Sequence, residues 1–193
     1  QVEMQTFSGS SLLTNNKTDM ALSLIYTGEI EIDKSIKIER SISKFLHSLS
    51  GLQYCITRLN SFNGIVFIVS CDQVFPTVAD NIKWNLIPHL EFLTGRKVVF
   101  GWTKVNDLAK LNYKFEEIKE SLKWCLTLGY DSIINPSKLA NIELKKLKYP
   151  YEIEKSMLIH IKNNNRAGLN KCLEEFLTYY KSEYYSPNHI IEA

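Results

Sequence analysis

The 193-residue chain lacks the sequence patterns of most enzyme sites. It has no GxGxxG or Walker-type glycine loop to hold phosphate groups, and no GxSxG segment to present a serine nucleophile. Its four histidines are scattered, and its four cysteines form no CxxC pair with a histidine at metal-ligand spacing. These absences predict a protein that is not an enzyme and that carries neither a metal nor another cofactor.

An excess of one charge is also missing, because 23 basic residues face 21 acidic ones and leave a net charge of +2. Nucleic-acid-binding domains concentrate Lys and Arg on one face, so any DNA contact is expected outside this chain. No run approaches the ~20 apolar residues of a membrane span, and the start shows no signal-peptide pattern. We read Cys55, Cys71, Cys125 and Cys172 as small core residues in a reducing compartment, and we expect a cytoplasmic protein without membrane contact.

What is present is an ordinary globular composition, with 45% hydrophobic and 23% charged residues. The chain starts with Gln1 and ends soon after Ser186-Pro187, a pair that suits the start of a further helix. We therefore expect it to be part of a longer protein.

Hydrophobic periodicity predicts alternating strands and helices, followed by helices alone. The expected strands are 20–27, 52–59, 65–69, 97–102 and 132–134. The expected helices are 34–49, 78–93 with a kink at Pro88, a long one from 106 or 107 to about 128, 151–161 and one around 169–180. Asn63-Gly64 suits a tight turn between the second and third strands. Gly95 and Gly129 are expected to end helices.

This order predicts an α+β fold, in which a ferredoxin-like antiparallel sheet with helices is followed by a C-terminal helical hairpin. Residues 1–18 are expected to be a linker or frayed lead-in, 19–136 the α/β domain, and 137–193 a truncated helical connector.

The hairpin in the middle of this order resembles the GGDEF (diguanylate cyclase) fold. Arg58-Leu59 and the apolar strand 65–69 lie where that family carries its signature turn, but residues 60–64 read NSFNG and contain no carboxylate. The first strand ends in Tyr26-Thr27 rather than in an acidic metal ligand. Because GTP cyclisation needs carboxylates that hold divalent metal, the resemblance implies a degenerate, non-catalytic domain.

Two further segments resemble the GGDEF-like regulatory domains of AraC/XylS-family bacterial transcription regulators. They are residues 101–108 (GWTKVNDL), with the helix that leads to Gly129 and Ser132-Ile133-Ile134, and residues 149–155 (YPYEIEK) at the start of the connector. The resemblance implies a regulatory domain that senses a ligand or forms a dimer. DNA would be bound only by a helix-turn-helix module outside this chain. The alternative is a catalytically dead nucleotide sensor.

Aromatic residues suggest two sites, each beside a plainer alternative. One group either packs in the core or lines a pocket for a small-molecule effector: Tyr54, Phe67, Trp84, Phe100, Trp102 and Trp124. A second group near the C-terminus either faces the core or forms a homodimer contact: Tyr179, Tyr180, Tyr184 and Tyr185.

Overall fold

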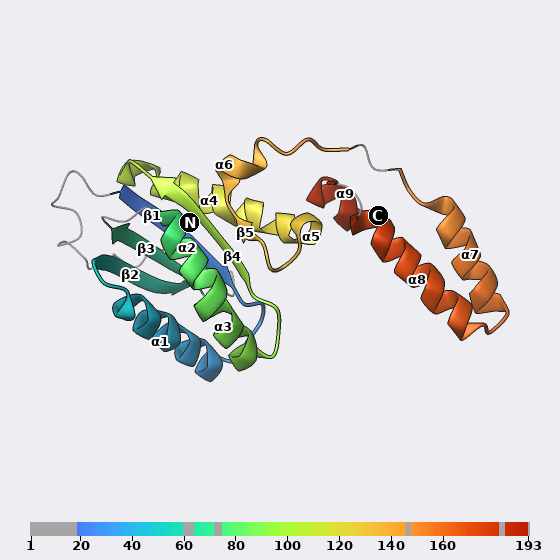
Figure 1. Cartoon of the computed structure of the whole chain (residues 1–193), viewed down its shortest axis with the longest axis horizontal. Helices are drawn as coiled ribbons and strands as arrows, with labels where there is room; N and C mark the ends of the chain where they lie inside the picture. The colour runs from blue at the N-terminus through green and yellow to red at the C-terminus, as the bar shows by residue number, and fades with distance from the viewer. Residues whose placement is uncertain (1–18, 60–63, 72–74, 146–147, 182–183, 193) are drawn as a thin grey trace. The chain divides into compact units, whose positions relative to one another are not determined.

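A computed structural model describes residues 19–59, 64–71, 75–145, 148–181 and 184–192 (Figure 1). Its strands are β1 (Asp19–Tyr26), β2 (Leu52–Leu59), β3 (Gly64–Cys71), β4 (Val99–Val105) and β5 (Ile133–Ile134). Its α-helices are α1 (Ile32–Ser48), α2 (Phe75–Asn81), α3 (Ile87–Thr94), α4 (Leu111–Ser121), α5 (Cys125–Leu128), α6 (Pro136–Leu139), α7 (Tyr151–Lys162), α8 (Arg166–Lys181) and α9 (Pro187–Glu192). The expected lead-in 1–18 and most of the expected turn, residues 60–63, lie outside the described residues.

The described chain divides into two compact units. The first comprises the residues up to 122 together with 130–140, and the second comprises 123–129 together with 141–193. The expected boundary after residue 136 lies close to residue 141, where the chain enters the second unit for the second time. Residues 123–129, which contain α5, group with the C-terminal helices, and no local sequence pattern predicts this grouping.

The first unit is built on a five-stranded sheet with the order β2-β3-β1-β4-β5. The first four strands pair antiparallel, and β5 pairs parallel to β4 through two residues. Thus the α+β class is confirmed, and the sheet is mixed rather than purely antiparallel. In the four antiparallel strands, each strand–helix–strand crossover leaves a gap that another strand fills, as in a split βαβ arrangement.

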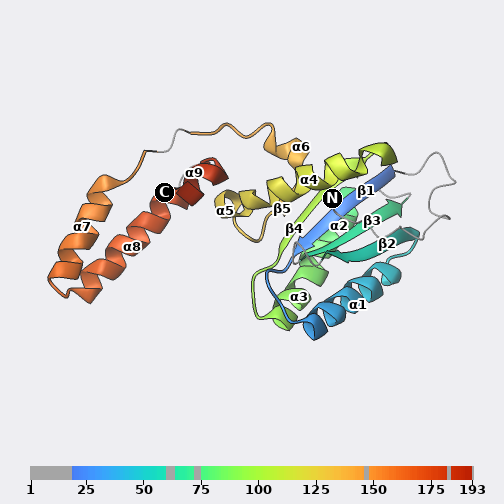
Figure 2. The same ribbon diagram turned by 180° about the vertical axis from the view of Figure 1, so that it is seen from behind.

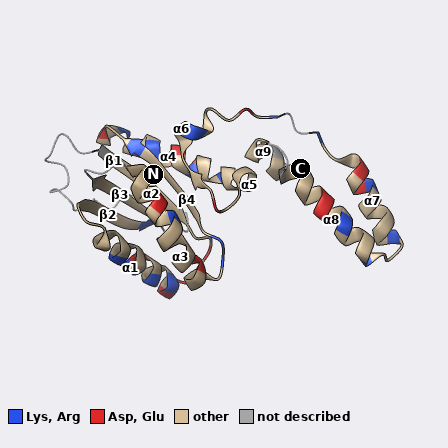
Figure 3. Ribbon diagram, viewed as in Figure 1, with Lys and Arg blue, Asp and Glu red and all other residues tan. Residues whose placement is uncertain are grey.

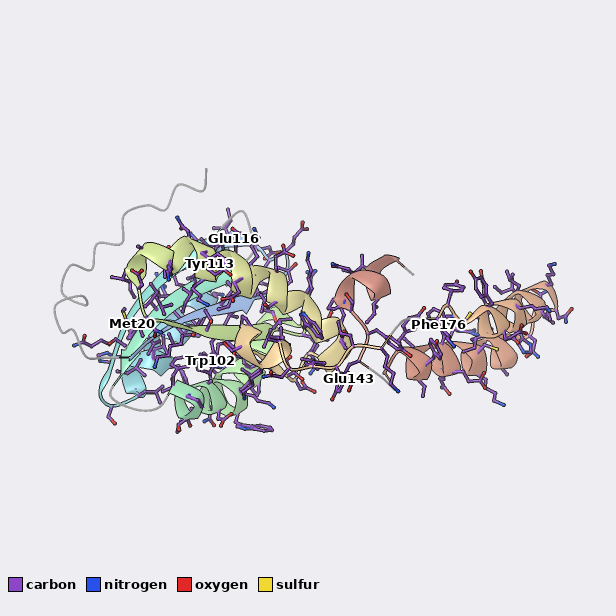
Figure 4. All side chains as sticks on the ribbon, turned by 90° about the horizontal axis from the view of Figure 1, so that it is seen from above. Met20, Trp102, Tyr113, Glu116, Glu143 and Phe176 are labelled. Atoms are coloured by element: carbon purple, nitrogen blue, oxygen red, sulfur yellow. The ribbon has the colours of Figure 1, made fainter. Side chains whose placement is uncertain are left out.

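Helices cover both faces of this sheet, as Figure 1 and the reverse view in Figure 2 show. On one face, α1 and the α2–α3 segment enclose the main core with alternate β1 residues such as Ala21 and Ile25. α1 contributes Ile38, Ile42 and Leu46, which recur every four residues and are fully buried. On the other face, α4 packs on β1 and β4. In Figure 4, Trp102 and the α4 residue Tyr113 lie on opposite sides of the sheet.

The helix expected over 78–93 is interrupted before Pro88 rather than bent at it. Residues Ile82–Leu86 form a π turn between α2 and α3, and Pro88 lies in the first turn of α3. Proline has no amide hydrogen for the carbonyl four residues earlier, and its ring collides with that carbonyl. The wider π turn relieves this collision, so the irregularity lies upstream of the proline.

The predicted helix ends are confirmed at three places. Asp107 accepts a hydrogen bond from the Ala109 amide at 2.9 Å and caps the short 3₁₀ turn that leads into α4. Gly95 and Gly129 follow the ends of α3 and α5 with φ values of 67° and 88°, which glycine adopts without strain.

The second unit contains the predicted helical hairpin. α7 and α8 lie antiparallel, and the residue at the middle of their turn, Asn164, has a φ of 50°. The Asn165 side chain accepts a hydrogen bond from the Gly168 amide at 2.9 Å and caps α8. The expected helix after Ser186 forms as α9. Among the described residues, no helix is both long and apolar enough to cross a membrane.

Gly101 allows close packing between β4 and the helix layer on the α4 face. A Cβ atom at this position would lie 2.8 Å from Cδ2 of Leu122 and 3.2 Å from the carbonyl oxygen of Ile134. We expect Gly101→Ala to lower the free energy of unfolding by about 1–3 kcal/mol, the usual effect of overpacking.

Urea unfolding of this variant, beside Asn112→Ala at an exposed position of α4, checks this expectation. The control is expected to change the free energy of unfolding by less than about 0.5 kcal/mol. Equal stability of Gly101→Ala and the parent would contradict the packing described here.

Candidate functional site

A cavity of about 330 Å³ lies at the end of the sheet where β1 leads into α1. Its described lining comes from two segments that the strand pairing brings together. Gly64 pairs with Tyr26 of β1 on one side and with Leu59 of β2 on the other. The described lining residues are Thr27, Ile30, Ile32, Ser35, Arg58, Leu59, Gly64 and Ile65.

Arg58 is the charged residue of this lining. Its Nη1 atom is buried and has no hydrogen-bond partner among the described residues. A buried donor that lacks an acceptor costs about 1–3 kcal/mol, and more when the group is charged. Arg58 also lines the cavity, and its guanidinium carries the positive charge with which an anionic oxygen in the cavity would form a charge-assisted hydrogen bond.

The first turn of α1 contributes further donors to the same cavity. Ile32 and Ser35 both line it, and the N-cap residue Glu31 makes no side-chain hydrogen bond to the helix. In that turn the Ser35 amide itself donates to the Glu31 carbonyl oxygen, and Asp33 adds a carboxylate. The amides before Ser35 still have no intrahelical acceptor, and the helix dipole adds partial positive charge there. Both effects favour an anion, in the same sense as Arg58.

The backbone of the loop between β1 and α1 accepts hydrogen bonds from side chains that hold the loop in place. Arg96 Nη1 donates to the carbonyl oxygen of Glu29 at 2.9 Å. Gly28, with a φ of 69°, makes the turn after the strand. The buried Thr27 hydroxyl donates to the carbonyl oxygen of Gly28 at 3.3 Å. The cavity wall therefore has a defined backbone conformation on this side.

The chemistry of the lining suits binding rather than catalysis. Ile30, Leu59 and Ile65 provide apolar surface, and the described lining contains no Asp, Glu, His or Cys. The hydroxyls of Thr27 and Ser35 thus have no general base beside them within that lining. Over the described part of the chain, no group of three His, Cys, Asp or Glu side chains is arranged to hold a metal ion.

The six aromatic residues named from the sequence do not share one site. Two are buried in the main core, Phe67 and Phe100, and two are partly buried against it, Tyr54 and Trp102. The Trp102 ring packs on Phe75 at 4.6 Å between centroids, and the Tyr54 hydroxyl donates to the carbonyl oxygen of Ser43 at 3.0 Å.

The other two aromatic residues lie elsewhere. Trp84 is on the surface, 68% exposed, with Lys83 Nζ 4.6 Å from its ring centroid, and Trp124 belongs to the second unit. None of the six is among the described lining residues of the cavity.

The four C-terminal tyrosines mostly pack within the second unit. The rings of Tyr179 and Tyr185 stack at 6.0 Å, and Tyr180 contacts both at 5.4 and 6.2 Å. Tyr185 is buried, and Thr127 donates to its carbonyl oxygen at 2.9 Å. Burial raises the pKa of the Tyr180 hydroxyl, with smaller contributions from Tyr149 and Tyr179.

Tyr184 is the one of these four tyrosines with a largely exposed side chain, at 52%. Tyr185 is buried and Tyr179 and Tyr180 are partly buried, so a dimer contact made by all four tyrosines would have little exposed ring surface apart from Tyr184.

The cysteines lie in apolar surroundings where they are described. Cys125 and Cys172 are buried, and Cys55 is half-buried. Burial raises the pKa of the Cys55 and Cys125 thiols, which disfavours the reactive thiolate. The side chain of Cys71 lies outside the described part of the structure.

Sequence reasoning passed over the residues that line the cavity. The sequence marks Arg58 and Leu59 only as neighbours of the central turn, and it assigns no role to the other lining residues. A usable signal was present: Arg58 is the one charged residue of the strand segment 52–59, and such a charge needs a partner. What the sequence did not show is that this strand end lies beside the start of α1.

Comparison with known proteins adds no assignment. No family model matches the sequence, and neither a curated protein nor a solved structure matches the chain.

If Arg58 serves ligand binding and not folding, replacing it will not lower the free energy of unfolding of the unliganded protein. We expect Arg58→Met, which keeps the apolar stem and removes the Nη1 donor that has no partner among the described residues, to leave the free energy of unfolding unchanged or to raise it by about 1 kcal/mol.

The matched control is Arg40→Met, at an exposed position of α1, which is expected to change stability by less than about 0.5 kcal/mol. A loss of 2 kcal/mol or more in Arg58→Met, in a chemical denaturation experiment, would mean that Arg58 stabilises the fold (about the effect of breaking a buried pair).

Proposed function

We propose that the chain is a non-catalytic regulatory domain that senses a small anionic molecule in the cavity beside Arg58. The observation that carries this proposal is that Arg58 lines a cavity of about 330 Å³ as its charged residue and that its Nη1 atom has no hydrogen-bond partner among the described residues. A cavity of this size lies at the lower end of the range for small-molecule sites. Its apolar walls and concentrated donors suit a carboxylate or phosphate attached to an apolar body.

Catalytic groups are missing both from the sequence motifs and from the described lining of the cavity. Residues 60–64 contain no carboxylate, and Thr27 stands where the first strand would need an acidic metal ligand. Metal-assisted phosphoryl chemistry requires such ligands to hold the ion against the phosphates. The cavity can therefore hold an anion through Arg58 but has no described residue to activate one.

The regulatory setting is proposed from the resemblance to AraC/XylS-type regulators. In that setting the domain belongs to a dimeric transcription regulator, and a helix-turn-helix module outside this chain binds DNA. The connector-like start of α7 supports this proposal, because residues 149–155 lead directly into the helical hairpin. A longer parent protein without a DNA-binding segment would rule this setting out.

The second candidate is a catalytically dead nucleotide sensor of the GGDEF fold. It is favoured by the position of the cavity, which lies beside the β2–β3 hairpin and the start of α1. It is disfavoured by the turn sequence, which lacks the paired glycines and the acidic residues of the active family. The two candidates differ in ligand and share the site.

A thermal-shift screen of the 193-residue chain tests both candidates. The probes are inorganic phosphate, GTP, a cyclic dinucleotide, and a set of phosphorylated and carboxylate metabolites. A ligand at 100 times its dissociation constant adds about 2.7 kcal/mol of stability, which is several degrees for a chain of this size. We expect a stabilising ligand that loses its effect in Arg58→Met and keeps it in Arg40→Met.

Each contrary result has a distinct meaning. Stabilisation that persists in Arg58→Met would place the ligand elsewhere and overturn the cavity as the sensor site. Stabilisation by guanine nucleotides alone would favour the second candidate over the first. No stabilisation by any probe would contradict both sensor proposals and leave a domain that acts through self-association.

A further inference from the structure

The α7–α8 hairpin exposes large apolar side chains along most of its length. Leu158 and Ile161 on α7 are 51% and 54% exposed, and Leu173 and Leu177 on α8 are 45% and 56% exposed. α7 contains no buried residue at all within its 12 described positions. A pair of helices cannot bury a full core alone, so amphipathic helices normally cover such surfaces with a further layer.

These four side chains share one face of the hairpin. Each directly follows a residue on the side where the two helices meet: Met157, His160, Cys172 and Phe176. Successive residues of a helix are rotated by about 100°, and the two helices run in opposite directions. The residues that directly follow the contact positions, two on α7 and two on α8, therefore point to the same side of the hairpin. We call the surface of Leu158, Ile161, Leu173 and Leu177 the leucine face.

The inward positions just named are supported by packing across the hairpin. Cys172 is buried, and a Cβ atom at Gly168 would overlap the His160 ring. The hairpin is thus closely packed where α7 meets α8 near the turn, and the leucine face is a separate, outward surface.

Charge is distributed unevenly along the hairpin, as Figure 3 shows. The half next to the turn, residues 157–171, carries Lys162, Arg166 and Lys171 and no acidic residue. The other half, residues 151–156 and 172–181, carries four acidic residues and two lysines. The net charges are therefore +3 and −2. Two hairpins placed side by side in parallel would put like charges together, whereas an antiparallel arrangement puts opposite charges together.

We propose that the leucine face is a self-association surface, on which a second copy of this chain packs antiparallel to form a four-helix arrangement. The occupant follows from the hairpin itself: the face is apolar, and the two halves of the hairpin that carry it have opposite net charge, so the hairpin is complementary to its own copy after a two-fold rotation. Apolar contacts provide the association energy, and the charged ends select the antiparallel orientation.

This inference deepens the dimer-forming part of the proposed function and rests on it, but it uses no residue of the cavity. It also places the contact away from the tyrosine cluster. Three of the four C-terminal tyrosines pack on one another, whereas the four residues of the leucine face are all about half exposed.

The test is sedimentation velocity of the 193-residue chain at concentrations from 1 to about 100 μM, a range that covers weak and moderate dimers. We expect the parent to dimerise and Leu158→Lys and Leu177→Lys each to raise the dissociation constant at least tenfold. The matched control is Ile159→Lys, because Ile159 is also 51% exposed and adjoins Leu158 but is rotated by about 100° from Leu158 and about 200° from Ile161, away from the leucine face. It is expected to dimerise like the parent.

The orientation of the two hairpins in the dimer is tested by changing the charge interactions between them. In the antiparallel dimer, Arg166→Glu and higher NaCl concentration both weaken association, because attraction between opposite ends is lost or screened. In a parallel dimer, higher NaCl would strengthen it.

A chain that stays monomeric at 100 μM would overturn the proposal, as would an Ile159→Lys variant as disruptive as Leu158→Lys. Strengthening of the dimer by NaCl would overturn the antiparallel orientation. These outcomes are independent of the sensor proposal, whose failure would show as an absence of ligand stabilisation in a chain that still dimerises.

Discussion

The first unit depends on the insertion of β1 between β3 and β4. Antiparallel pairing on both sides runs along almost the whole strand, from Met20 to Tyr26. Because helices cover both faces, β1 is an almost continuous apolar run, in which Ala21 to Ile25 are buried. The same register brings the end of β1 beside Gly64 and Leu59, and the candidate cavity lies there. The site is therefore a consequence of strand pairing.

The elements with local signals were predictable from the sequence. Helical spacing identified α1, α4, α7 and α8, and Gly95, Asp107 and Gly129 marked helix ends that the structure confirms. Local signals did not locate the π turn before Pro88, because a proline indicates a disturbed helix but not how the backbone relieves the clash. They also did not show that the last strand pairs parallel to β4, which depends on a two-residue contact distant in sequence.

The candidate site was less predictable than the fold, for a physical reason. Aromatic residues were chosen because they line pockets, but the same residues also fill cores. Phe67 and Phe100 are core residues, whereas Trp84 lies at the surface. The candidate cavity is marked by an arginine nitrogen that has no partner among the described residues and by a helix start, and both depend on neighbours that are remote in sequence. The two proposed roles lie in different units: the first unit contains the cavity, and the second carries an apolar face suited to self-association.

The most direct test of the sensor account is an NMR titration of the labelled chain with inorganic phosphate, followed at the Arg58 side chain and at the backbone amides. The account predicts saturable shifts concentrated at Arg58, at the first turn of α1 around Ile32, and at Gly64. The amides around Trp84 and Tyr184 should stay unchanged. Shifts concentrated away from the cavity, or none at Arg58 up to about 100 mM phosphate (weaker than a millimolar site), would contradict an anion-binding role for this cavity.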